Sequence, residues 1–368
     1  MNSNWLTGKT VVITGGSGGL GLALAQRLIH RWGCHVIATG RSPERLEAAR
    51  AAIGETPDGS YICRAFDVTD RAAWADFSAD LAKRGVSVDV LINNAGFMLP
   101  FTRLEKLCDG DIDRILETNL RAYLTAFRAL YPLMPTGRGK SRPAVIHIVS
   151  AGGLCPVVGQ GMYCATKYAL RGVTDALRAE HPDLYVCGVY PGFIRTDILA
   201  HQTVDTAAPT RENRRIRRLM LPADVAARRI LRRVSRHRRQ IVVGADGHLL
   251  SVAGRWFPRA TAGLIRGVLH ASRLSLFRDV FEGCRQGTRR FGATPRNAQL
   301  KPMRCIRGII PGVGAAFFGN FARLRGICCR RLPERKVCSV KIILIRTPGI
   351  LSPLLRRLFG IRRQKPGR

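Results

Sequence analysis

The chain has 368 residues, 46% of them apolar, and a formal net charge of +35. This length supplies core material for one large domain or two small ones, and the ordinary apolar fraction excludes wholesale disorder. The charge is divided unequally, because residues 1–200 hold 22 Lys+Arg against 18 Asp+Glu and residues 201–368 hold 38 against 7. That division excludes a uniformly basic DNA-packing protein and indicates a near-neutral domain followed by a basic appendage.

Eleven cysteines are scattered along the chain, without a CxxC pair or a Cys/His cluster at zinc spacing. An odd, unpatterned count is typical of reduced thiols, so we expect a reducing, cytoplasmic location and no metal site. The first nine residues lead directly into an apolar run, which leaves no room for a signal peptide. No run of eighteen apolar residues occurs, so no membrane-spanning helix is predicted.

Apolar β-branched runs alternate with helical patterns along the first 280 residues. Strands are predicted at 10–13, 35–39, 61–66, 88–92, 144–149, 184–190 and 241–243, and helices follow the first strand and cover 43–53, 70–84, 111–133 and 163–180. This alternation is typical of right-handed βαβ units. We predict an α/β fold, a Rossmann-type doubly wound parallel sheet of about seven strands with helices on both faces.

The fold is predicted to span residues 1–280, with residues 281–368 as a basic extension. Residues 200–221 show no clear strand and no apolar helical face. A long connection of this kind at the end of a strand is often an active-site lid, which we predict over about 193–221.

A glycine-rich loop, residues 14–21 (TGGSGGLG), joins the first strand to the first helix. Glycine permits positive φ and lets the backbone approach a pyrophosphate, while the helix N-terminus presents unpaired N–H groups and a positive dipole end. Many such loops are only turns, but this one has the strand–loop–helix context that the motif requires. Dinucleotide binding is predicted, with contacts from Thr14, Gly15, Ser17, Gly19, Leu20 and Gly21.

The residues that follow the second strand select between the two nicotinamide cofactors. An acid there would bind the ribose 2′-OH of NAD, whereas an arginine accommodates the 2′-phosphate of NADP. The sequence has Gly40, Arg41 and Ser42 and no acid at this point. We therefore predict NADP(H) in preference to NAD(H); the alternative is that Arg41 is a solvated residue at a helix start.

Tyr163 and Lys167 stand four residues apart and share one helix face. A lysine ammonium beside a phenol stabilises the phenolate, so we expect a lowered pKa for Tyr163 and a role in proton exchange with a carbonyl or alcohol. Ser150, at the end of the fifth strand, can meet Tyr163 in space and hydrogen-bond a substrate oxygen. Alone, such a pair is usually structural; together with the glycine loop it indicates catalysis.

The combined motifs resemble the short-chain dehydrogenase/reductase family. They are Thr14-Gly15-x-x-x-Gly19-x-Gly21, Asn93-Asn94-Ala95-Gly96, Asn119, Ser150, Tyr163-x-x-x-Lys167 and Pro191-Gly192, in the family's order over about residues 7–260. The resemblance implies that Tyr163 is the general acid/base and that Lys167 lowers its pKa and holds the nicotinamide ribose. It implies that Ser150 positions the carbonyl and that Asn119 anchors a water that relays protons to Lys167.

The same resemblance implies further contacts to the cofactor. Asp67 and Val68 would touch the adenine, Asn94 and Ala95 would lie under the adenosine ribose, and Thr196 would meet the nicotinamide end. Gly96, Pro191, Gly192 and Ile194 are expected beside them. A structural turn remains the alternative for Asn94, and a helix cap remains the alternative for Asp67.

The expected reaction is reduction of a ketone or aldehyde, or oxidation of the matching secondary alcohol. Residues 97–99 and 154–158 are apolar and would flank the site, which favours a lipid-like, steroid-like or aromatic substrate. Arginines 211, 214, 215, 217 and 218 would form either a cationic mouth for an acidic group or a solvated helix. The alternative function is a non-catalytic dinucleotide-binding scaffold or sensor that acts through its basic tail.

Two basic amphipathic stretches occur in the second half. Residues 228–239 are interpreted as a packed surface helix with arginines outside, and residues 340–359 carry an apolar face bordered by arginine. For the extension three alternatives stay open: disordered or non-selected sequence, peripheral association with an anionic membrane, and nucleic-acid binding. Few aromatics and no zinc or RNA-binding motif make nucleic acid the least favoured. The family's habit of pairing through its fourth and fifth helices implies a homodimer or homotetramer.

Overall fold

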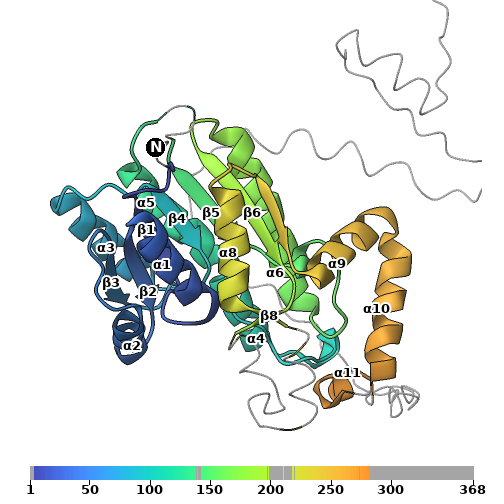
Figure 1. Cartoon of the computed structure of the whole chain (residues 1–368). Coiled ribbons are helices and arrows are strands. Elements are labelled where there is room, and N and C mark those ends of the chain that lie inside the picture. The colour runs from blue at the N-terminus through green and yellow to red at the C-terminus, as the bar shows by residue number, and fades with distance from the viewer. Residues whose placement is uncertain are drawn as a thin grey trace, which may run out of the picture. The chain divides into compact units, whose positions relative to one another are not determined.

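The computed structural model describes residues 4–137, 139, 142–196, 198, 210, 218, 220–272 and 274–281 (Figure 1). These residues belong to one compact unit, Met1–Gly292. The proposed boundary near residue 280 stays a prediction, because residues 282–368, including the amphipathic stretch 340–359, lie outside the described residues. Most of the predicted lid lies outside them as well.

Seven parallel strands form the central sheet in the order β3-β2-β1-β4-β5-β6-β9. They are β1 (Thr10–Thr14), β2 (His35–Gly40), β3 (Ser60–Ala65), β4 (Val90–Asn93), β5 (Ala144–Ile148), β6 (Tyr185–Pro191) and β9 (Gln240–Val243). The chain runs outward from β1 to β3 and then returns to β4 beside β1, so the strand order reverses between β1 and β4. The predicted doubly wound α/β fold is confirmed, and such a switch point is where ligands bind in open α/β sheets.

Ten α-helices connect or follow the strands in the described part of the chain. They are α1 (Gly19–Trp32), α2 (Pro43–Ile53), α3 (Arg71–Lys83), α4 (Asp109–Leu116), α5 (Ala122–Leu130), α6 (Gly161–Glu180), α8 (Ala223–Val234), α9 (Ala245–Trp256), α10 (Pro258–Ser272) and α11 (Arg278–Phe281). A two-stranded sheet, β7 (Ile194–Arg195) with β8 (Leu221–Pro222), begins and ends the region predicted as a lid.

The alternation of side chains along each strand places one set of apolar residues on each face of the sheet. Val11 and Ile92 belong to the cluster that packs under α1, α2 and α8, whereas Val12 and Leu91 belong to the cluster under α3 and α5. Figure 1 shows α1 and α8 in front of the sheet. Buried strands with helices on both faces explain the near-continuous apolar runs in the sequence.

The helix predicted over 111–133 is interrupted. Between α4 and α5 lies a π-helical turn, Glu117–Arg121, which buries Asn119 completely. A π-turn inserts one extra residue and often marks a functional site. Periodicity alone did not predict this break, because the residues on either side of it are equally helical in pattern.

The helix predicted over 228–239 is α8, and Ile230, Leu231 and Val234 face the core as expected. The predicted end is wrong, because α8 stops at Val234 and residues 235–239 form the turn that leads into β9. The α9–α10 hairpin that follows was not predicted as separate helices. Within the described chain, no helix combines the length and the apolarity needed to cross a bilayer.

Candidate functional site

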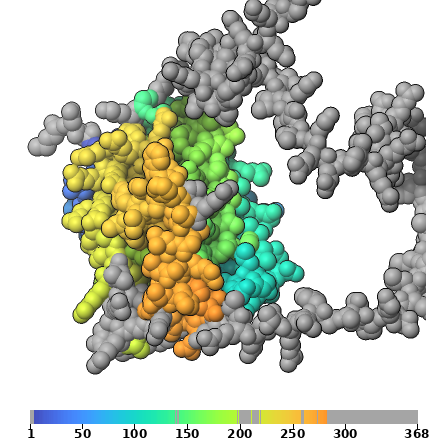
Figure 2. All heavy atoms as spheres, turned by 90° about the vertical axis from the view of Figure 1, so that its right-hand side faces the viewer, coloured from blue at the N-terminus to red at the C-terminus, as the bar shows by residue number. Residues whose placement is uncertain are grey.

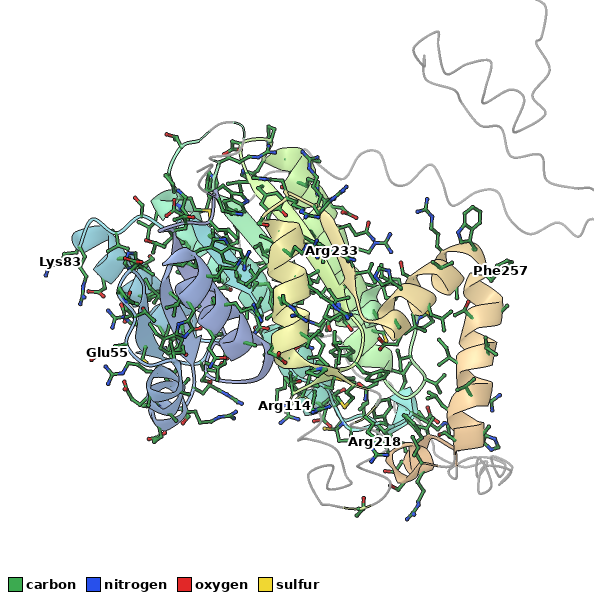
Figure 3. The ribbon with its side chains drawn as sticks, in the orientation of Figure 1. Glu55, Lys83, Arg114, Arg218, Arg233 and Phe257 are labelled. Carbon is green, nitrogen blue, oxygen red and sulfur yellow. The ribbon has the colours of Figure 1, made fainter. Side chains whose placement is uncertain are left out.

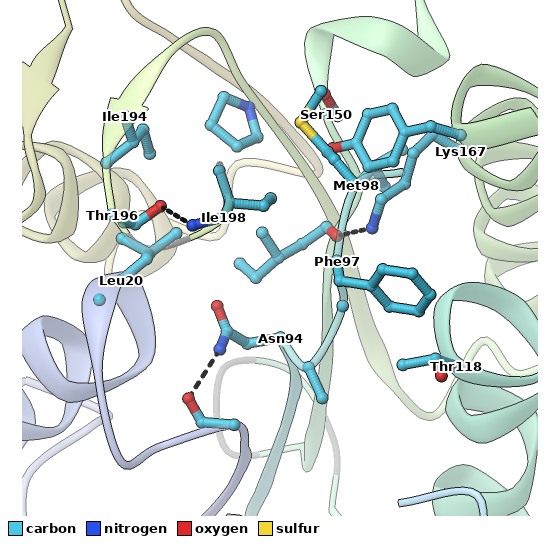
Figure 4. A pocket seen from close by; sticks show the side chains of 18 of the residues that line it. Leu20, Asn94, Phe97, Met98, Thr118, Ser150, Lys167, Ile194, Thr196 and Ile198 are labelled. Carbon is cyan, nitrogen blue, oxygen red and sulfur yellow. Dashed lines mark hydrogen bonds between the residues drawn. The ribbon is translucent and has the colours of Figure 1, made fainter. Parts of the chain in front are cut away.

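The carboxyl ends of the central strands open into a cavity of about 1080 Å³ (Figure 4). Its walls contain most of the residues predicted from the sequence: Gly15, Ser17, Gly19, Leu20, Arg41, Asp67, Val68, Asn94, Ala95, Gly96, Ser150, Tyr163, Lys167, Pro191, Gly192, Ile194 and Thr196. Thr14, Gly21 and Asn119 do not line the cavity and lie behind its walls. The structure therefore brings the glycine loop and the Ser/Tyr/Lys set into one space.

The glycine loop is held too tightly for side chains. A Cβ placed on Gly21 would lie 2.2 Å from the carbonyl oxygen of Gly15, and Gly15 itself has φ +66°. Gly19 also has positive φ, and a Cβ there would lie 3.1 Å from Thr196. Only glycine meets both demands, so the loop presents bare backbone to the cavity.

The N-terminus of α1 faces this loop without a side-chain cap. Its N-cap residue is Gly18, in extended conformation, and no side chain accepts from the first-turn N–H groups. Such groups carry a partial positive charge and bind phosphate well. The uncapped helix start and the side-chain-free loop fit a dinucleotide pyrophosphate.

Thr14 and Asn94 tie the loop to the end of β4. The Thr14 hydroxyl accepts from the backbone N–H of Asn94 at 2.8 Å and of Ala95 at 3.0 Å. The Asn94 amide in turn donates to the carbonyl oxygens of Thr14 and Gly15, at 3.0 and 3.1 Å. Asn94 thus links the ends of β1 and β4 at the switch point. It has this structural role and also lines the cavity.

Two arginines and one aspartate line the end of the cavity beyond the loop. Arg41 directly follows β2, and the Arg45 side chain reaches to 3.0 Å from a Cβ placed on Gly18. Asp67 accepts from the backbone and hydroxyl of Thr69, at 2.9 and 2.8 Å. The α3 cap is Asp70, so the alternative reading of Asp67 as the helix cap is wrong.

Ser150, Tyr163 and Lys167 meet at the opposite side of the cavity. Ser150 follows β5, and its hydroxyl oxygen accepts from Gly152 N–H at 3.0 Å and shares a hydrogen bond with Tyr163. Tyr163 and Lys167 lie one turn apart on α6, with Lys167 Nζ 5.7 Å from the Tyr163 ring centre. Lys167 donates to the Ile148 carbonyl at 3.1 Å (Figure 4).

Burial decides the ionisation of these groups. Burial raises the pKa of Tyr163 to about 12, although the hydrogen bond with Ser150 works in the opposite direction. Burial also lowers the pKa of Lys167 to about 7. The expectation that Lys167 brings the pKa of Tyr163 toward neutrality stays a prediction, because burial is the largest influence on both groups and acts against their charged forms.

Asn119 lies beside Lys167 but uses its side chain elsewhere. Its Oδ1 accepts from the Phe97 N–H at 3.0 Å, and its Nδ2 donates to the Phe97 carbonyl at 2.9 Å. A Cβ placed on Gly96 would lie 3.1 Å from Asn119 Oδ1 and 3.7 Å from Lys167 Nζ. The Asn119 amide therefore positions the Gly96–Phe97 backbone, which lies between Asn119 and Lys167.

The wall near Tyr163 is apolar. Phe97, Met98, Val157, Met220 and Leu250 line it. The sequence predicted that residues 97–99 and 154–158 flank the site; of these, Phe97, Met98 and Val157 do so, while Leu99 is buried in the core cluster behind. Of the five arginines in the predicted cationic mouth, only Arg218 lies within the described residues, and it is exposed.

Sequence reasoning missed two polar residues that shape the site. Asp246 accepts from the Phe193 N–H at 2.6 Å and holds the Pro191–Gly192 turn against α9. Gln160, buried at the start of α6, donates to the Leu99 carbonyl at 2.8 Å. Asp246 follows β9 at the carboxyl edge of the sheet, where functional side chains gather, and that position was the available signal.

Residues 9–207 match the family model of short chain dehydrogenases. A 3-oxoacyl-[acyl-carrier-protein] reductase of Rickettsia conorii is 33% identical over 196 residues, which cover 52% of this chain and 76% of that protein. An NADP-dependent 3-hydroxy acid dehydrogenase of Salmonella typhi is 34% identical over 170 residues, which cover 46% of this chain and 65% of that protein.

Solved structures share the fold. A short-chain dehydrogenase from Sphingobium yanoikuyae in complex with NADPH has a TM-score of 0.54 and 25% identity, over 73% of this chain and 97% of that one. One from Burkholderia cenocepacia in complex with NADP has a TM-score of 0.57 at 21% identity, over 71% and 98%. Because the family model covers more than half of the sequence, the chain belongs to the short-chain dehydrogenase/reductase family and is an NAD(P)-dependent oxidoreductase acting on a CH–OH group.

Proposed function

We propose that this enzyme interconverts an apolar ketone or aldehyde and its alcohol with NADP(H). The observation that carries the proposal is the meeting of Ser150, Tyr163 and Lys167 in the same cavity as the bare glycine loop. A cofactor whose pyrophosphate lies on the loop would extend along the cavity towards these three side chains. The fit of an uncapped helix start to a phosphate supports that placement.

The cofactor, when bound, supplies or accepts the hydride at the carbonyl carbon. In the reducing direction Tyr163 gives the proton of its hydroxyl to the substrate oxygen, which becomes the alcohol oxygen. The raised pKa of Tyr163 keeps this hydroxyl protonated at neutral pH, so it is ready to donate. Ser150 donates a hydrogen bond to the same oxygen and favours the charge that develops on it.

Lys167 is placed to replace the proton that Tyr163 gives away. Burial lowers the pKa of Lys167 to about 7, which makes its ammonium a readier proton donor than a solvated lysine. Its Nζ lies behind the Tyr163 ring and close to Gly96, beside the Asn119 turn. The implied role of Asn119, to anchor a water that relays protons to Lys167, is kept as part of the proposal, and its side-chain amide acts as a positioning group for the Phe97 backbone.

The preference for NADP(H) is supported by charge at the end of β2. Arg41 and Arg45 both line that part of the cavity, and Gly40, rather than an acid, ends the strand. Guanidinium groups pair well with a phosphate oxygen, whereas a ribose hydroxyl gains little from them. Three of the similar proteins are named with NADP or NADPH, in keeping with this preference.

An apolar substrate is supported by the wall around the proton donor. Phe97, Met98, Val157, Met220 and Leu250 offer hydrocarbon and thioether surface to a substrate. A site of that kind favours a lipid-like, steroid-like or aromatic carbonyl over a sugar. The rival function, a non-catalytic dinucleotide-binding scaffold, would not need Ser150 and Tyr163 to share a hydrogen bond.

The test is a panel of carbonyl substrates, assayed by the loss of NADPH absorbance with full-length protein. Steroid, medium-chain aliphatic and aromatic ketones and aldehydes are compared with open-chain sugars of similar reactivity. We expect turnover of at least one apolar class, with a larger kcat/KM for NADPH than for NADH. Turnover of sugars alone would contradict the substrate class, and NADPH binding without any turnover would favour the scaffold.

A cytoplasmic location, a homodimer or homotetramer and membrane association of the extension also remain proposals. The location is supported by the cysteines of the described chain, which are free thiols: Cys34, Cys63, Cys108, Cys155, Cys164 and Cys187. Analytical ultracentrifugation at several concentrations would test the subunit number.

A further inference from the structure

The α9–α10 hairpin exposes an unusual amount of apolar surface. Six large side chains of this hairpin are 59–70% exposed, namely Leu249, Val252, Trp256, Phe257, Leu264 and Val268. Large exposed apolar patches on a folded protein usually mark an interaction site. Figure 2 shows α9 and α10 crossing one face of the molecule beside α8, and Figure 3 shows Phe257 at the outer end of the hairpin.

The apolar residues follow the spacing of one face on each helix. On α9, Leu249, Val252 and Trp256 stand at i, i+3 and i+7, and on α10 Leu264 and Val268 stand four apart. Residues at this spacing share a helix face. The exposed apolar surface is therefore organised along the two helices rather than scattered.

The hairpin's other side is fixed to the enzyme body. Leu250 lines the active-site cavity, and Asp246 binds the Phe193 N–H. A Cβ placed on Gly254 would lie 2.7 Å from the Leu154 carbonyl, which shows how closely α9 approaches the segment after β5. The outer face is thus a surface held in place, not the open side of a loose terminal helix.

Basic residues border this surface. Arg255 and Arg266 are exposed on the hairpin itself, and His248 of α9 shares a surface hollow of about 380 Å³ with four arginines of α8 and the turn after it: Arg229, Arg232, Arg233 and Arg236. On the described part of α9 and α10 the only acid is Asp246, which is occupied with Phe193. A partner that fits this face therefore has an apolar interior and a negatively charged surface.

We propose that the α9–α10 hairpin docks the enzyme peripherally on an anionic lipid membrane. Aromatic tips enter the headgroup boundary, apolar faces follow, and arginines pair with lipid phosphates, which is how amphipathic interfacial segments bind. A second copy of the chain carries the same arginines and would meet like charge here. Residues 285–368, with 21 Lys+Arg and one acid, Glu334, would also meet like charge.

Trp256 gives a direct probe of the hairpin. It is 70% exposed, whereas Trp74 is 1% exposed and Trp5 and Trp32 are half-buried. Full-length protein is mixed with vesicles of equal parts phosphatidylcholine and phosphatidylglycerol that carry brominated acyl chains, which quench a nearby indole. We expect a blue shift and quenching of Trp256 fluorescence, absent in Trp256→Phe, and little effect with phosphatidylcholine alone.

Two paired variants separate the apolar and the charged parts. Phe257→Ser with Leu264→Ser should weaken vesicle partitioning by roughly tenfold or more, because two large apolar side chains no longer insert into the lipid. Arg232→Gln with Arg236→Gln should weaken binding to anionic vesicles only and reduce its sensitivity to salt. Ile62→Ser, which removes a 40% exposed apolar residue on β3, is the matched control and should bind as wild type.

Three results would overturn the proposal. Co-sedimentation with vesicles without quenching of Trp256 would place the membrane contact elsewhere, in the extension. Equal quenching by neutral and anionic vesicles would remove the role of the arginines. Protection of Trp256 from acrylamide in lipid-free protein, together with a loss of assembly mass in Phe257→Ser with Leu264→Ser, would make the hairpin a subunit interface. Circular dichroism of each variant establishes that it is folded.

Discussion

The cavity at the carboxyl edge of the sheet and the α9–α10 hairpin both combine apolar residues with arginine, but they use them in opposite ways. Around the cavity, Met98 and Tyr163 are 7% exposed and share a packed cluster with Phe101. On the hairpin, Trp256 and Leu264 are 70% and 67% exposed. The first region is mostly buried, whereas the second exposes its apolar side chains to solvent. This difference in burial is the one expected between a cavity for a small molecule and a surface for association.

The largest effect is expected from a change that removes the proton donor in the cavity. Replacing Tyr163 by Phe removes the proton donor and leaves the ring in place, so kcat should fall by roughly 10²–10⁴-fold, the usual contribution of general acid–base catalysis. NADPH affinity, measured by fluorescence titration, should stay within about threefold, since one hydrogen bond at most is lost. Turnover that survives this change would refute the proposed mechanism.

The second expected effect sharpens the claim that the loop has no room for side chains. Gly21→Ala places a Cβ 2.2 Å from the Gly15 carbonyl oxygen, and overpacking of this kind costs about 1–3 kcal/mol. We expect a lower Tm and loss of most of the NADPH affinity. Gly172→Ala is the control, because a Cβ there meets nothing within 4 Å on α6 and alanine favours the helix. Equal behaviour of the two variants would contradict the steric argument.

A third effect concerns Arg41, an exposed arginine at the rim of the cavity. Arg41→Ala should raise the KM for NADPH about tenfold, equivalent to about 1.4 kcal/mol, by removing a charge-assisted hydrogen bond to the 2′-phosphate. The KM for NADH should change little, so the ratio of the two kcat/KM values is the measurement. An equal change for both cofactors would show that Arg41 does not select between them.

The smallest effect probes a polar group of the protein core, His147 on β5. Thr174 donates its hydroxyl proton to the Leu170 carbonyl at 2.6 Å, so its oxygen accepts from His147 Nδ1 at 2.9 Å. His147 Nε2 is buried and has no hydrogen-bond partner among the described residues. Burial lowers the pKa of His147 to about 3, well below that of an unfolded histidine near 6.5.

The sign of the pH effect follows from that depressed pKa. Between about pH 6.5 and pH 3 the unfolded chain binds a proton that the folded chain does not, so the free energy of unfolding falls as the pH falls. His147→Asn should therefore lose less stability than wild type between pH 7 and pH 5, as measured by Tm. His30→Asn, on the exposed face of α1, should keep the wild-type pH dependence; an unchanged dependence in His147→Asn would count against the buried neutral imidazole.

The sequence by itself determined the features that depend on local pattern. Apolar runs of three to seven residues predicted the strands, because a sheet buried on both faces needs them. The loop from Thr14 to Gly21 could be interpreted because its glycines and the following helix are adjacent in the chain. Tyr163 and Lys167 could be paired because i and i+4 share a helix face whatever the rest of the molecule does.

Only the tertiary structure decided what depends on residues far apart in the sequence. Asp246 reaches Phe193 across 53 positions, and Asn119 faces Phe97 across 22, through a π-turn that periodicity does not reveal. Burial is the largest influence on the pKa of Tyr163, and it raises that pKa. The exposure of Trp256 likewise depended on how α9 packs. Desolvation and long-range contacts are properties of the folded chain, and for that reason pattern alone could not assign them.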